Sequence, residues 1–106
     1  MRENILKKRG SQKEAIDMEL TEMPNIGKEV SKKLIAVGID TPEKLISLGS
    51  KEAFIRIKTI DDTACFSMLQ GLEGAIQGVR WYHLPDSKKK DLKEFLNHLS
   101  RLISEI

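Results

Sequence analysis

The sequence has 106 residues, of which 40% are hydrophobic and 32% are charged, and its formal net charge at pH 7 is +2. This length predicts a single small domain, and the hydrophobic fraction excludes an intrinsically disordered chain. The near-neutral charge neither requires nor excludes a polyanionic partner.

The chain carries no signal for secretion or for membrane insertion. Its first ten residues are charged and lack an apolar segment. No run approaches the roughly 18 apolar residues that a membrane span requires. The single cysteine, Cys65, has no partner for an internal disulfide, which is typical of a reducing compartment. We therefore expect a cytoplasmic protein with no membrane partner.

Apolar residues recur at helical spacing and predict an all-α fold, a single domain of about five or six helices. The first 18 residues differ from the rest in their charge. Residues 1–16 carry five basic and two acidic side chains, whereas residues 17–23 carry three acids and no base. We predict an N-terminal extension over residues 1–18 and a helical domain over residues 19–106.

A turn of sequence Pro24-Asn25-Ile26-Gly27 separates two predicted helices, over residues 20–23 and 28–37. The first helix is expected to end at the proline, because the residue before proline is disfavoured in helical conformation. Asn25 tolerates a left-handed backbone, and Ile26 is expected to fill the space between the two helices. The glycine then opens the second helix.

The start of that second helix is predicted to attract an anion. The backbone N–H groups of Gly27, Lys28 and Glu29 have no partner within the helix, and a phosphate diester suits such a position. With Ser31 and Leu34, the turn resembles the helix-hairpin-helix motif, which grips the nucleic-acid backbone without reading sequence. The candidate nucleic-acid-binding residues are Asn25, Ile26, Gly27, Lys28, Lys32 and Lys33.

The ends of the next helices are marked by residues that typically start or stop a helix. Gly38 is expected to end the helix over residues 28–37, with Ile39 folding back onto Leu34. Thr41-Pro42-Glu43 predicts the N-cap and first turn of a helix that ends near residues 48–49. Ser50 is predicted to cap a further helix over residues 51–58.

A helix over residues 61–79, capped by Asp61 or Asp62, is predicted to be the buried central helix. Cys65 lies on its apolar stripe and is expected to be a buried packing thiol. Interior glycines cost about 1 kcal/mol each relative to alanine, so a second backbone is expected close to the face that carries them. Those glycines are Gly71, Gly74 and Gly78.

Trp81 and Tyr82 come next and are expected to cover the core at a corner between helices; stacking on a nucleic-acid base is the alternative. A long amphipathic helix follows Pro85, with Asp86 or Ser87 as its N-cap, and is expected to pack across the hairpin. Its apolar stripe consists of Leu92, Phe95, Leu96, Leu99, Leu102, Ile103 and Ile106.

The remaining polar residues form no pattern typical of catalysis. His83 and His98 are 15 residues apart and lack the spacing of metal ligands. No glycine-rich loop follows a strand. We therefore predict no enzymatic activity, no metal site and no cofactor.

Several blocks in order resemble the C-terminal domain of TfoX (Sxy), over about residues 20 to 100. The blocks are MPNIGKEVSKKLIAVGIDTPEKLISLG, then LEGAIQGVRW, then LP before the last helix. The resemblance implies a regulator in a DNA-related process, since proteins of that family regulate competence for DNA uptake. TfoX-type regulators carry an additional N-terminal domain where this sequence has 18 residues, so the competence role does not transfer automatically.

One residue of the hairpin also departs from its motif, because Glu29 stands where a lysine is usual. A carboxylate there repels a phosphate by on the order of 1 kcal/mol, and salt screens this repulsion. The neighbouring Lys28, Lys32 and Lys33 are expected to compensate.

We expect a DNA-associated regulator or adaptor that binds the backbone of double-stranded DNA weakly through the hairpin. The alternative is a protein–protein interaction module whose hairpin has no nucleic-acid role. Its partner is then a regulatory protein or, in a homodimer, a second copy of the chain.

Overall fold

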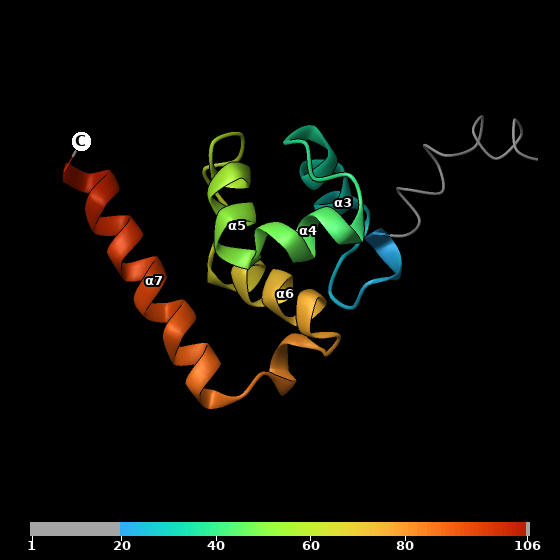
Figure 1. The fold of residues 1–106 in the computed structure, drawn as a ribbon. Helices are drawn as coiled ribbons and strands as arrows, with labels where there is room; N and C mark the ends of the chain where they lie inside the picture. Colours follow the sequence, from blue (N-terminus) through green and yellow to red (C-terminus); the bar gives the residue numbers. More distant parts are fainter. Residues whose placement is uncertain (1–19, 106) are drawn as a thin grey trace, which may run out of the picture.

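The computed structural model describes residues 20–105, so the predicted extension over residues 1–18 and Ile106 lie outside the described residues. Residues 20–22 are helical and lead into the hairpin turn. The elements that follow are α3 (Lys28–Ala36), α4 (Pro42–Leu48), α5 (Ser50–Lys58), α6 (Phe66–Gln77), the 3-10 helix η1 (Trp81–His83) and α7 (Asp86–Glu105). The described part of the chain contains no strand. The prediction of an all-α domain is confirmed (Figure 1).

Local sequence signals set the ends of α3 and α4, as predicted. Gly38 follows α3 with a φ of +86°, a value that suits glycine. The N–H of Ile39 then donates to the carbonyl of Leu34 at 2.8 Å, and both side chains are fully buried. At the start of α4, Thr41 Oγ1 accepts the N–H of Lys44 at 3.1 Å.

The central helix is shorter than predicted. It begins at Phe66 rather than near Asp61, because the Asp61 carboxylate closes a turn by accepting the N–H of Thr63 at 3.0 Å. Cys65 is the extended residue before the helix and is exposed, so the expectation of a buried thiol is wrong. Gly78 ends the helix with a φ of +76° and does not lie within it.

A buried polar network joins α5, α6 and α7. Ser50 begins α5, one residue earlier than predicted, and its Oγ donates to Glu73 Oε1 at 2.6 Å. Gln77 Nε2 donates to Glu73 Oε2 at 2.7 Å, and Lys88 Nζ lies 3.7 Å from the same oxygen. Burial by itself would raise the pKa of Glu73, but these hydrogen bonds and the Lys88 charge hold the pKa below its usual value.

The core lies around α6, which packs against α4, α5, α7 and η1. Full burial of one leucine or phenylalanine side chain contributes about 1.5–3 kcal/mol, so the fully buried side chains of the core supply most of the stabilising free energy. The fully buried large side chains include Leu20, Leu34, Ile39, Leu45, Phe54, Ile57, Leu69, Leu72 and Leu92.

The last helix does not pack across the hairpin, and that expectation is wrong. α7 packs against α6, and its Asp91 forms an ion pair of 2.9 Å with Lys51 of α5. In Figure 1, α3 and α7 lie on opposite sides of α5 and α6. Leu92 is fully buried, whereas Leu102 and Ile103 near the end of α7 are about half exposed. Within residues 20–105, no helix has the length and apolar character needed to cross a membrane.

Candidate nucleic-acid interface

The hairpin turn has the conformation that its sequence predicts. Asn25 adopts a left-handed φ of +70°, and Ile26 is buried in the core cluster. Gly27 is the extended residue before α3, and no side chain caps the helix there. The N–H of Ser31 donates to the Gly27 carbonyl at 2.9 Å and makes the first hydrogen bond of the helix. The N–H groups of the first three residues of α3 therefore have no partner within the helix.

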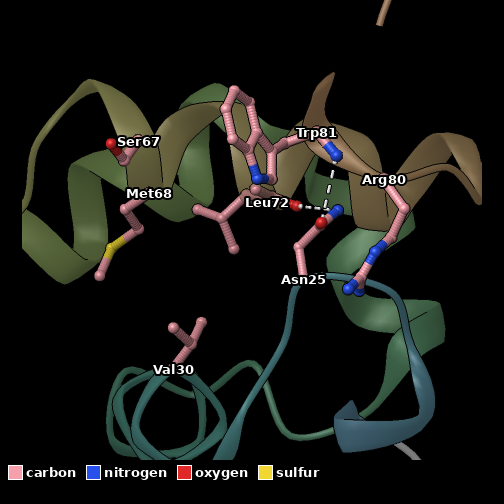
Figure 2. Close-up of a pocket in the computed structure, with 8 residues that line it drawn as sticks. Asn25, Val30, Ser67, Met68, Leu72, Arg80 and Trp81 are labelled. Atoms are coloured by element: carbon pink, nitrogen blue, oxygen red, sulfur yellow. Dashed lines mark hydrogen bonds between the residues drawn. The ribbon is translucent and has the colours of Figure 1, made fainter. Parts of the chain in front are cut away.

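The Asn25 side chain points into the molecule, toward α6 and the segment that follows it (Figure 2). Its Nδ2 donates to the carbonyl oxygens of Gly71 at 3.3 Å and Val79 at 3.0 Å. Its Oδ1 accepts the N–H of Trp81 at 3.1 Å. The structure therefore gives the predicted site residue Asn25 a positioning role, because its polar atoms are engaged by protein groups.

The small-residue face of α6 lies against this asparagine. A Cβ atom built on Gly74 would lie 2.6 Å from Asn25 Nδ2 and 2.7 Å from the carbonyl oxygen of Val79. A Cβ built on Gly71 would lie 3.5 Å from the Asn25 Cβ. The prediction that another backbone approaches this face is confirmed, and that backbone belongs to the hairpin turn and to residues 79–81.

The three lysines of α3 separate into two groups. Lys28 and Lys32 are exposed and lie one helical turn apart, so they share a face that starts at Gly27. Lys33 instead forms an ion pair of 2.6 Å with Asp61. The structure thus brings Gly27, Lys28 and Lys32 together at the surface and withdraws Lys33. Glu29 is also exposed there.

A pocket of about 350 Å³ lies beside the turn, between the hairpin, α6 and η1. Trp81 forms one of its walls and is 46% exposed, and the adjacent Tyr82 is 52% exposed. The expectation that these two rings cover the core is therefore wrong. Leu84 is the nearby side chain that enters the core. The pocket is lined by Asn25, Val30, Ser67, Met68, Gly71, Leu72, Arg80 and Trp81 (Figure 2).

The local sequence assigns no role to Arg80 and does not place Trp81 among the site residues. The one signal present is an aromatic pair that closely follows a helix-ending glycine. The contribution of the hairpin to this pocket depends on contacts across more than 40 residues of sequence, which no local pattern encodes. Within residues 20–105, no three histidine, cysteine or acidic side chains come together as a metal site.

The Lys33–Asp61 ion pair predicts a specific dependence of stability on pH. The hydrogen bond from Lys33 and those from Thr63 lower the pKa of Asp61 from 3.8 to about 2. Because the pKa is lower in the folded state, the stabilisation is complete above about pH 4 and is lost as the pH falls toward 2. We expect wild type to be more stable than Asp61→Asn at pH 5, and this difference to shrink steadily down to pH 2.

Urea unfolding of both proteins across this range measures the difference directly. Since the other carboxyl groups titrate in both proteins, their contributions cancel in the comparison. A difference in unfolding free energy that stays constant from pH 5 to pH 2 contradicts the proposed ionic role of Asp61.

Comparison with known proteins identifies the family. No curated protein matches this sequence. A crystal structure of an uncharacterized protein from Listeria monocytogenes, in a triclinic form, is 51% identical with a TM-score of 0.75, covering 76% of this chain and 92% of the other. A tetragonal form of a Listeria monocytogenes protein of unknown function is 51% identical with a TM-score of 0.73, covering 76% of this chain and 99% of the other. The TfoX C-terminal domain matches residues 16–96, and the chain therefore belongs to the TfoX C-terminal domain family.

Proposed function

We propose that this protein is a non-enzymatic, cytoplasmic regulator or adaptor that associates with double-stranded DNA. It binds the DNA backbone weakly and without sequence preference. The observation that carries this proposal is the exposed, uncapped start of α3, where Gly27 lies beside Lys28 and Lys32. Membership of the TfoX C-terminal domain family supports a DNA-related process.

The residues of the hairpin have different roles in binding. A phosphate at the start of α3 accepts hydrogen bonds from backbone N–H groups and gains from the helix dipole. The ammonium groups of Lys28 and Lys32 add attraction along the same face. Asn25 and Ile26 hold the turn in place from inside the fold. Since the hairpin neutralises only one or two phosphates, binding is weak and sensitive to salt.

Glu29 provides the test of this proposal. Glu29→Lys replaces a repulsive carboxylate with an ammonium group, a change of two charges at the anion site. We expect it to tighten duplex binding about fivefold at about 50 mM salt. Lys28→Ala combined with Lys32→Ala is expected to weaken binding by a similar factor for any duplex sequence. Both effects are measured by titrating a labelled duplex at two salt concentrations.

A matched control separates local contacts from overall charge. Lys89→Ala combined with Lys90→Ala removes the same charge from α7, on the other side of the fold. We expect this control to leave duplex affinity within about twofold of wild type. Equal losses from the two double variants would show that net charge, and not the hairpin, attracts DNA.

A protein-interaction module is the second candidate, and a surface on α7 favours it. Leu102 and Ile103 are about half exposed, and a groove of about 270 Å³ runs between α5 and the last turns of α7. Such a groove suits a regulatory protein or a second copy of the chain. Sedimentation at increasing concentration distinguishes the two candidates. Self-association, together with no binding of duplex at low salt, would favour this second function.

A further inference from the structure

We propose that the pocket beside the hairpin holds one unpaired nucleotide of a nucleic-acid strand. The base lies against Trp81, and the phosphate of that nucleotide lies against Arg80. The inference rests on the proposed function for the kind of ligand. It adds a preference: a strand with unpaired bases binds more tightly than a duplex.

The aromatic wall is the first support for this proposal. Trp81 is 46% exposed as a residue and lines the pocket, so part of its large apolar surface has no protein cover. The backbone N–H of Trp81 donates to Asn25 Oδ1, which fixes the backbone of this residue. The Tyr82 ring contacts the indole edge-on, with ring centroids 5.4 Å apart. Exposed aromatic rings held in this way are the usual platforms for stacked bases.

The rest of the pocket suits a flat, largely apolar group. Figure 2 shows Val30 and Leu72 below the indole, with Met68 and Ser67 farther along α6. The Ser67 hydroxyl is a donor and an acceptor for the polar edge of a base. A volume of about 350 Å³ lies at the lower end of the range for small-molecule sites, so the pocket accommodates a single nucleotide.

The charge of Arg80 indicates an anionic ligand. Its side chain extends beside Asn25 at the edge of the pocket (Figure 2). In the part of the chain that the structure describes, no carboxylate lies within ion-pair distance of its guanidinium. An unpaired guanidinium beside an apolar, aromatic pocket matches a ligand that joins a ring to an anion.

The position of the pocket favours a nucleotide over an acidic, aromatic peptide. Asn25 and Val30 of the hairpin line the pocket, and Lys28 and Lys32 follow the same turn on α3. A strand whose base enters the pocket therefore has further phosphates to place near these lysines. A peptide with one aromatic and one acidic side chain fills the pocket but has no further anionic groups to place near Lys28 and Lys32.

The single tryptophan makes the test direct, because Trp81 is the only source of indole fluorescence in the chain. Four ligands are titrated: a short oligothymidylate, an abasic strand of equal length, a blunt duplex, and a short peptide with aromatic and acidic side chains. We expect the oligothymidylate to quench Trp81 emission and to bind at least fivefold more tightly than the abasic strand. Trp81→Ala is expected to weaken oligothymidylate binding about tenfold and to leave duplex affinity unchanged.

Two further variants complete the test. Trp81→Phe keeps an aromatic face and is expected to restore most of the lost affinity, measured with a labelled strand. Arg80→Gln is expected to weaken oligothymidylate binding by several-fold and to reduce its dependence on salt. Thermal melting of each variant confirms that it is folded. If Trp81→Ala does not fold, the proposal is decided on the wild-type protein, by the quenching of Trp81 and by the affinity for oligothymidylate relative to the abasic strand.

The failures of the two proposals are distinguishable. If the duplex binds through Lys28 and Lys32 while oligothymidylate and the abasic strand bind equally, the pocket proposal is overturned and the proposed function stands. If no strand or duplex binds, both are overturned. Quenching of Trp81 by an aromatic, acidic peptide but not by oligothymidylate assigns the pocket to a protein partner and overturns the nucleotide.

Discussion

Gly74→Ala is expected to lower the free energy of unfolding by about 3 kcal/mol, because the added methyl group has no room. Its carbon would lie 2.6 Å from Asn25 Nδ2 and 2.7 Å from the Val79 carbonyl oxygen. The second of these atoms belongs to the backbone and cannot turn aside as a flexible side chain does. The substitution also displaces the asparagine that fastens the hairpin turn to α6.

Gly71→Ala is the matched control, one helical turn earlier on the same face. The added carbon would lie 3.5 Å from the Asn25 Cβ, which is ordinary van der Waals contact. Since alanine is favoured over glycine in a helix by about 1 kcal/mol, we expect this variant to be at least as stable as wild type. Urea unfolding measures both variants. Equal stabilities for the two would show that the turn does not lie against α6 as closely as the structure places it.

The comparison of the two glycines shows which parts of the fold the sequence predicts. The close approach of a backbone to α6 is predicted from its glycines, because interior glycines destabilise a helix unless another backbone lies against the face that carries them. The identity of that backbone does not follow, because Asn25 lies 46 and 54 residues from Gly71 and Val79, whose carbonyls it binds. Local signals such as Thr41 and Gly38 act within a few residues, and their roles are predicted correctly.

The errors of prediction share a physical cause. The sequence predicts that Asp61 or Asp62 caps the central helix, yet the Asp61 carboxylate closes a turn with Thr63 and pairs with Lys33 at 2.6 Å across 28 residues. It also predicts that Ser50 caps α5, but the hydroxyl of this residue binds Glu73. In both cases a side chain predicted to cap a helix binds a residue distant in sequence, and no local pattern indicates that partner.

Trp81 illustrates the same limit for function. An aromatic pair at a corner between helices usually covers a core, and composition gives no reason to expect otherwise. Here the η1 turn directs Leu84 inward and leaves Trp81 and Tyr82 at the surface. The pocket that results is formed by three separate segments, so its lining could not be read from any one of them.

Asn25→Asp is expected to destabilise the protein by about 3 kcal/mol at neutral pH, although the side chain keeps its size. The two carbonyl oxygens that Nδ2 approaches need a donor, and the Trp81 N–H needs an acceptor, so the orientation of the amide is fixed by its partners. In the aspartate variant, a carboxylate oxygen faces both carbonyl oxygens. Repulsion then replaces two hydrogen bonds.

The pH dependence of this variant distinguishes repulsion from a simple loss of contacts. When the introduced carboxyl group is protonated, it donates to one of the carbonyls, so the folded state favours the neutral acid and raises its pKa above the usual value. The destabilisation is therefore complete above that raised pKa and decreases as the pH falls through it. Asn25→Gly accommodates the φ of +70° and lacks the side-chain hydrogen bonds, so its cost relative to wild type is expected to be smaller and independent of pH. Urea unfolding from pH 7 to pH 4, followed by Trp81 emission, measures both. A deficit of Asn25→Asp that matches that of Asn25→Gly at every pH would show that the side chain does not face the two carbonyls.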